Sequence, residues 1–119
     1  SGVGIADLKT GKAAVQKGAA KTRGHAAQLG VYEILYEHTT GTPITEDAEI
    51  IGLSTAGDNK IGFGKIHGAK EMLIGSGKET GLIEYAAAIF NTGLFPPNNQ
   101  SALCSKKYCP RWDACKFKG

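Results

Sequence analysis

The sequence predicts an α/β fold whose elements follow the order β-α-β-β-α ahead of a cysteine-rich tail. Apolar and polar residues alternate near the start and again over 48–67, as in half-buried strands. Apolar residues recur every three or four positions over 22–38 and 82–90, as in helices. All three cysteines fall after residue 98, in a segment with little periodicity, so something other than a hydrophobic core must order it.

The first half of the chain predicts one strand and one helix. Val3 and Ile5 alternate with small residues, which predicts a strand over 3–9. Residues 10–12 are a turn signal, and the small, polar and glycine-bearing residues 13–20 predict a loop. The helix over 22–38 is expected to end at residues 39–43, because glycine and proline continue a helix poorly.

The second half predicts a hairpin and a long helix. The strands are expected over 48–55 and 61–67, joined by a turn at 57–60. The helix is expected over 69–91. Its glycines at 75, 77 and 81 each cost about 1 kcal/mol relative to alanine, so it is expected to break there while 82–90 holds.

Composition bounds the function classes. A chain of 119 residues builds one small domain, and no apolar run is long enough to span a membrane. An odd number of cysteines argues against a complete disulfide framework and favours a reducing, cytoplasmic compartment. Residues 1–25 and 104–119 each carry a net charge of +4, against −5 between them. Basic ends on one face would suit a polyanion such as DNA; lysines that only solubilise the domain are the alternative.

Asp7 and Lys9 are the first candidates for chemistry. Residues two apart on a strand point to the same side, so a carboxylate and an ammonium would share one face. A carboxylate can ligate Mg²⁺, and a nearby lysine can stabilise charge that develops on a phosphate. A surface ion pair at a strand end is the alternative.

Gln28 and Tyr32 are the second pair of candidates. They lie four apart on the first expected helix and therefore share a helix face, which His25 joins three positions earlier. An ordinary amphipathic helix with a solvated glutamine is the alternative.

Together, the segments IADLKTGK at 5–12 and QLGVY at 28–32 resemble the PD-(D/E)XK nucleases, in particular the RecB-type and phage exonuclease branch. The resemblance implies a restriction-endonuclease-like core and Mg²⁺- or Mn²⁺-dependent hydrolysis of DNA in phage or bacterial recombination. It makes Asp7 a metal ligand and Lys9 the catalytic lysine. It places Gln28 and Tyr32 at the DNA-facing edge, and the backbone carbonyl of Leu8 in the metal shell.

The tail resembles the cysteine-rich C-terminus of the same branch. There, three late cysteines and one early cysteine hold a [4Fe-4S] cluster, a role that would fall to Cys104, Cys109 and Cys115. Soft thiolates suit iron–sulfur clusters and, as a less favoured choice, Zn²⁺. Cysteines that pack as small apolar residues are the alternative. Trp112 is expected to cover the tail against the last helix, with base stacking as the alternative.

The resemblance also implies an earlier acidic residue, and no Asp or Glu lies upstream of Asp7. We therefore expect the C-terminal part of a nuclease, with a partial core over 1–97 and a tail over 98–119, inactive by itself. The expected partners are DNA and either the N-terminal part of the same protein or a recombination partner, with no membrane. A non-catalytic, cysteine-tailed nucleic-acid-binding module and an inactive structural fragment are the alternatives.

Overall fold

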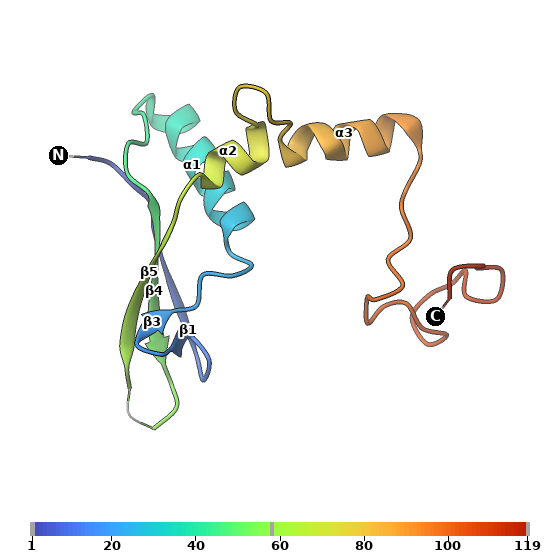
Figure 1. Ribbon diagram of the computed structural model, residues 1–119, viewed down its shortest axis with the longest axis horizontal. Coiled ribbons are helices and arrows are strands. Elements are labelled where there is room, and N and C mark those ends of the chain that lie inside the picture. Colours follow the sequence, from blue (N-terminus) through green and yellow to red (C-terminus); the bar gives the residue numbers. More distant parts are fainter. Residues whose placement is uncertain (1, 58, 119) are drawn as a thin grey trace. The chain divides into compact units, whose positions relative to one another are not determined.

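The computed structural model describes residues 2–57 and 59–118, and Figure 1 shows its helices and strands. The chain divides into two compact units, Ser1–Ala86 and Ala87–Gly119, which we call the sheet unit and the tail unit. Asp58, in the turn expected over 57–60, lies outside the described residues. The sequence-based boundary between a core over 1–97 and a cysteine-rich tail over 98–119 is a separate division, and it stays a prediction.

The sheet unit contains a mixed three-stranded sheet with the strand order β1-β4-β5, formed by Ala6–Gly11, Ala48–Ser54 and Ile61–Ile66. β1 runs parallel to β4, and β4 runs antiparallel to β5. This mixed sheet with its helices is consistent with a restriction-endonuclease-like fold, and the expected α/β class is confirmed.

β1 begins and ends later than the sequence predicts. The expected strand covered 3–9, with a turn at 10–12, whereas Thr10 and Gly11 belong to the strand. They pair with Leu53 and Ser54 of β4, so the parallel neighbour extends the strand into the glycine turn.

The loop expected over 13–20 is wrong, because this segment forms a small hairpin. β2 (Val15–Gln16) and β3 (Ala19–Ala20) pair antiparallel across the two residues Lys17 and Gly18. Both turn residues have positive φ, 52° and 79°, as a type I′ turn requires. The Lys17–Gly18 pair could have indicated this turn, but the small residues on either side of it show no strand pattern.

The hairpin packs on glycines of the large sheet. A Cβ on Gly52 would lie 2.6 Å from the carbonyl oxygen of Ala14, and one on Gly62 would lie 2.8 Å from the backbone of Ala19. The glycines therefore allow backbone to lie directly on backbone.

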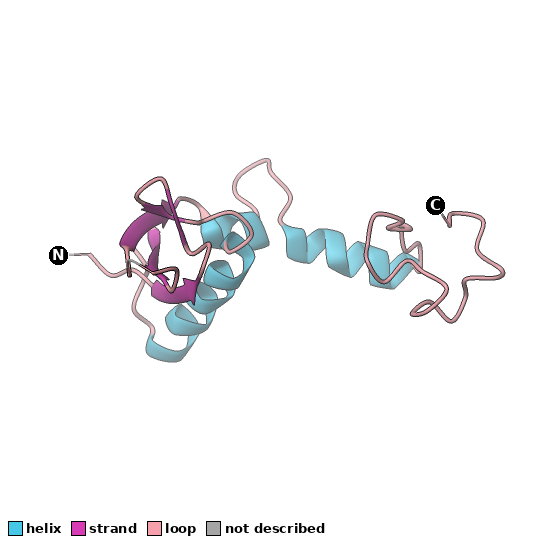
Figure 2. Cartoon of the chain, turned by 90° about the horizontal axis from the view of Figure 1, so that it is seen from below, coloured by secondary structure: helices cyan, strands magenta, loops and turns pink. Residues whose placement is uncertain are grey.

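α1 (Ala26–Thr40) lies over the same face of the sheet (Figure 2). It starts four residues later than expected, and Gly41 ends it in the left-handed conformation with φ 72°. Leu29 of α1 and Ile50 of β4 are fully buried in one core cluster. Burying two such side chains contributes on the order of 2 kcal/mol each.

The long second helix is broken, as expected. α2 (Ala69–Ile74) ends at Gly75, and α3 (Leu82–Thr92) starts after the glycine-bearing turn. Gly75 and Gly77 have φ of 83° and 55°, which a right-handed helix does not tolerate. In the tail unit, the described residues after α3 form turns and loops, with no helix or strand.

The second face of the sheet is apolar and exposed. The pairing aligns Leu8 with Ile51 and Phe63 across all three strands, and Ile61 lies beside them on β5. Leu8, Phe63 and Ile61 are each about 60% exposed. These side chains therefore form an exposed apolar face on the side of the sheet opposite α1.

Gly30 sets the approach of α1 to α2. A Cβ on Gly30 would collide with the carbonyl of Ala69 and lie 2.9 Å from Cδ1 of Leu73. The two helices therefore pack at a distance that only glycine permits.

We expect Gly30→Ala to destabilise the chain by about 1–3 kcal/mol, because overpacking outweighs the gain of about 1 kcal/mol in helix propensity. Urea unfolding followed by circular dichroism measures the effect. Ala27→Gly, at an exposed position of the same helix, reports propensity alone. A stabilised Gly30→Ala variant would mean that α1 and α2 are not in close contact.

Candidate active site

Asp7 and Lys9 lie on one face of β1, as the period of two predicts. The pairing of Asp7 with Ile50 and of Lys9 with Gly52 puts both on the face that α1 covers. Lys9 Nζ lies 2.7 Å from Asp7 Oδ2, and both side chains are about three-quarters covered. The two groups therefore form an ion pair at the junction of sheet and helix.

Gln28 and Tyr32, both on α1, extend this ion pair through two hydrogen bonds. Lys9 Nζ donates a hydrogen bond to Gln28 Oε1 at 2.6 Å, and Gln28 Nε2 donates to Tyr32 Oη at 3.0 Å. The expected convergence of these four side chains is confirmed, while their roles in catalysis stay a prediction. Lys9 thus donates one hydrogen bond to Gln28 and forms an ion pair with Asp7.

Asp7 and Leu8 offer oxygens of the kind that Mg²⁺ binds. Asp7 Oδ2 is enclosed and has no hydrogen-bond partner among the described residues apart from the ion pair with Lys9. The carbonyls of Ile5 and Gly11 accept from the β4 side, and carbonyl directions alternate along a strand. The Leu8 carbonyl therefore faces the open edge of β1, which in the described chain has no second strand.

These two oxygens do not complete a metal site. Mg²⁺ requires near-octahedral coordination by about six oxygens. Within residues 2–57 and 59–118, no group of three or more His, Cys, Asp or Glu side chains is placed to hold a metal ion. The Asp7 carboxylate and the Leu8 carbonyl fit as two ligands, and the described residues place no second carboxylate beside them to complete a metal site.

Comparison with known families decides the identity of this arrangement. The family model described as the PD-(D/E)XK nuclease superfamily matches residues 1–116. The chain belongs to the PD-(D/E)XK nuclease superfamily. Neither a curated protein nor a solved structure matches the chain.

Membership defines the broad chemistry of the chain. Members of this superfamily are typically nucleases, use Mg²⁺ or Mn²⁺ and act on DNA. The match covers the Asp7–Lys9 strand and the Gln28–Tyr32 helix, and it extends through the tail to residue 116. A separate property is that the described helices include none long and apolar enough to cross a membrane.

The three tail cysteines of this superfamily member lie around one small pocket of about 350 Å³. Each is half-buried and a free thiol, and the backbone N–H of Phe117 donates to Cys115 Sγ at 3.4 Å. The expectation that the cysteines lie near one another agrees with this arrangement. As placed, however, they are not a group that holds a metal ion in the described chain, so the cluster has no support from geometry.

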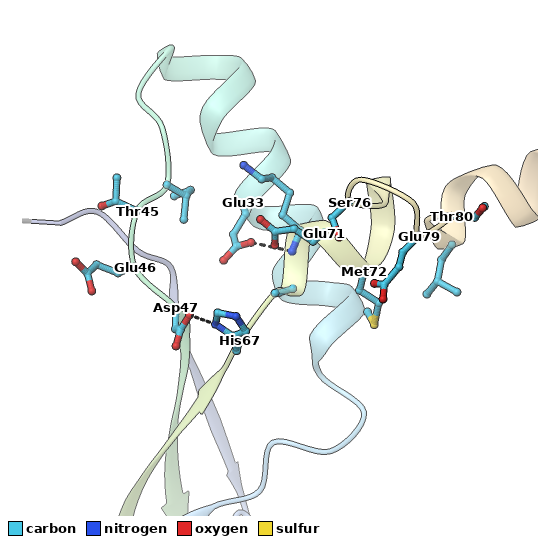
Figure 3. Close-up of a pocket in the computed structure, with 15 residues that line it drawn as sticks. Glu33, Thr45, Glu46, Asp47, His67, Glu71, Met72, Ser76, Glu79 and Thr80 are labelled. Atoms are coloured by element: carbon cyan, nitrogen blue, oxygen red, sulfur yellow. Dashed lines mark hydrogen bonds and ion pairs between the residues drawn. The ribbon is translucent and has the colours of Figure 1, made fainter.

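A second pocket, of about 730 Å³, lies in the sheet unit and was not expected from the sequence (Figure 3). Its lining includes five carboxylates: Glu33, Glu46, Asp47, Glu71 and Glu79. Asp47 is paired with the exposed His67 at 2.8 Å, and this hydrogen bond raises the pKa of His67.

Glu33 is the buried member of this set. Its Oε2 accepts a hydrogen bond from the backbone N–H of Lys70 at 3.0 Å, while Lys70 Nζ contacts Glu37 at 2.8 Å. Desolvation raises the pKa of Glu33, and the hydrogen bond from Lys70 opposes this only in part. The available signal was the spacing of four from Leu29, which places Glu33 on the buried side of α1.

Two substitutions separate the charge of Glu33 from its hydrogen bond. A raised folded pKa means that ionised Glu33 costs stability as the pH rises above its ordinary value of 4.5. Glu33→Gln, which keeps an acceptor, should therefore be at least as stable as the wild type at pH 7, and the difference should vanish below pH 4.5.

Glu33→Leu leaves the Lys70 N–H without a partner and should cost about 1–3 kcal/mol. Chemical unfolding across a pH series measures both variants. Equal destabilisation of the two at pH 7 would contradict the assigned cause of the pKa shift.

Proposed function

We propose that this chain is the C-terminal part of a metal-dependent DNA exonuclease of phage or bacterial recombination or repair. The observation that carries the proposal is the placement of Lys9 between Asp7 and Gln28, at 2.7 and 2.6 Å. A lysine held from two sides is preorganised, and a preorganised cation stabilises transition-state charge at little reorganisation cost.

Each residue then has a distinct role. Lys9 binds a phosphate oxygen and stabilises the negative charge that builds on it during hydrolysis. Asp7 and the Leu8 carbonyl would hold Mg²⁺ or Mn²⁺, which supplies a more acidic water and neutralises phosphate charge. Gln28 orients Lys9, and Tyr32 orients Gln28, so these two are positioning residues at the edge that faces DNA.

Two observations support the proposal that this chain is part of a longer protein. The described residues supply one carboxylate beside Lys9 where a metal site needs more acidic ligands. The apolar face formed by Leu8, Phe63 and Ile61 is about 60% exposed and needs a cover. We propose that the N-terminal part of the same cytoplasmic protein, or a recombination partner, provides both. Residues 1–119 alone should then have little nuclease activity.

The decisive test is Lys9→Ala in the longer protein. Loss of one transition-state donor typically costs on the order of 10²–10³ in rate, so cleavage of linear DNA should fall by that factor. DNA binding should stay nearly unchanged. Gln28→Leu should lower kcat by a smaller factor, because Lys9 stays present but loses its orientation.

Lys78→Ala, at an exposed position of the loop between α2 and α3, is the matched control and should cleave as the wild type does. Steady-state kinetics with Mg²⁺ separate kcat from KM. Unchanged turnover of Lys9→Ala at saturating DNA would reduce Lys9 to a phosphate contact. Robust cleavage that survives Asp7→Ala would place the active site elsewhere.

We also propose that Cys104, Cys109 and Cys115 hold a [4Fe-4S] cluster once a fourth ligand joins them from outside residues 1–119, with Zn²⁺ as the weaker alternative. All three line one pocket, and a cluster would require them to move closer together, because as placed in the described chain they do not form a metal site. Anaerobically purified longer protein should carry iron and absorb visible light, and Cys109→Ser should lose both. Wild-type protein free of iron and zinc, and no more stable than Cys109→Ser, would return the cysteines to a packing role.

A further inference from the structure

Three lysine–aromatic pairs mark the surface of the tail unit. Lys107 Nζ lies 4.8 Å from the ring centroid of Tyr108, and Lys116 Nζ lies 5.1 Å from that of Phe117. Lys118 Nζ lies 5.8 Å from the ring of Trp112, six positions earlier in the chain. Each large aromatic ring between residues 104 and 118 therefore has an ammonium group within cation–π range.

These rings are not buried in a core. Tyr108 is 55% exposed and Phe117 is 47% exposed, and Trp112 is partly exposed. No residue of the tail unit is buried among those described. The exposed surface of these rings is therefore accessible to a ligand.

Charge adds a second property. Residues 104–119 carry five basic residues and one acidic residue, and all five basic side chains are exposed. A short series of turn hydrogen bonds holds the backbone, including Cys109 N to Ser105 O at 2.8 Å and Trp112 N to Cys109 O at 3.1 Å. The rings and cations thus stand on an ordered loop scaffold, drawn in Figure 2 without helix or strand.

We propose that the tail segment 104–118 is a binding surface for single-stranded DNA. Unpaired bases would stack on Tyr108, Trp112 and Phe117, and the neighbouring ammonium groups would contact the phosphates. Single-strand binding proteins combine these two elements, because every base has a π-face and every nucleotide carries one negative charge.

Duplex DNA fits this surface less well. Its base faces are already covered by neighbouring base pairs, so only the phosphates remain accessible to the lysines. The choice of DNA over RNA rests on the proposed nuclease function. The stacking surface itself uses no residue of the Asp7–Lys9 site and needs no metal.

The test uses residues 1–119 in EDTA and a fluorescein-labelled 20-nucleotide oligothymidine, with binding followed by anisotropy. Stacking on one ring is worth about 1–3 kcal/mol, so Tyr108→Leu should weaken binding about tenfold. Tyr85→Leu is the matched control, because Tyr85 of α3 is 58% exposed and carries no lysine contact of this kind. Tyr108→Phe keeps the ring and should bind as the wild type does.

The salt dependence tests the lysines separately. Each phosphate contact on a single strand contributes about 0.7 to the slope of log K against log salt, so Lys107→Gln should lower the slope by about that amount. Lys65→Gln in the sheet unit should leave it unchanged. Circular dichroism of each variant confirms that the fold is retained. Quenching of the Trp112 fluorescence by oligothymidine should accompany binding.

Three results would overturn the proposal. The first is equal binding by Tyr108→Leu and Tyr85→Leu. The second is binding of a 20-base-pair duplex as tight as that of oligothymidine. The third is binding of a 20-nucleotide oligouridine at least tenfold tighter, which would assign RNA instead.

Lys9→Ala separates this surface from the nuclease site. If the nuclease proposal fails, cleavage by the longer protein is unaffected by Lys9→Ala, whatever the tail binds. If the tail proposal fails, binding in EDTA is insensitive to the rings, whatever Lys9 does.

Discussion

The burial of Leu29 against the sheet is the contact on which the rest of the sheet unit depends. Leu29 has no exposed surface and shares the core with Ile50 of β4. Its two neighbours in the sequence serve the two sides of α1: Gln28 reaches Lys9, and Gly30 lies against α2. Truncating such a side chain typically costs 2–5 kcal/mol, and here it would also release the helix that orients Lys9.

Polar contacts then lock α1 at both ends of its buried stripe. Near its start, the Asp7–Lys9–Gln28–Tyr32 series joins it to β1. Further along, Glu33 and Glu37 join it to Lys70 of α2, and the hydrogen bond from Lys70 lowers the pKa of Glu37. These groups are partly enclosed, so their hydrogen bonds orient the helix more than they stabilise the fold. The proposed site at this sheet–helix junction would gain from such orientation, because a small shift of α1 would move Gln28 away from Lys9.

Elements with a clear period were predictable, and those defined by close backbone contact were not. The alternation over 48–55 and 61–67 matches β4 and β5 within a residue or two, and the glycines at 75 and 77 break the second helix as their propensity demands. The β2–β3 hairpin escaped prediction because its strands are two residues long and show no alternation. It is stable only because it lies on Gly52 and Gly62, which are distant in the sequence.

The sequence by itself determined the α/β class and the candidate residues Asp7, Lys9, Gln28 and Tyr32, since periods of two and of four place each pair on one face. The tertiary structure decided the contacts that join the two pairs, because the distance from strand to helix depends on how Leu29 packs. It alone also revealed the buried Glu33, the exposed apolar face of the sheet and the lysines beside the tail aromatic rings. Burial and contacts between distant residues decide the first two, which local pattern does not encode. Lys107 and Lys116 are sequence neighbours of their rings, and there the side-chain conformations decide that each ammonium group lies over the ring.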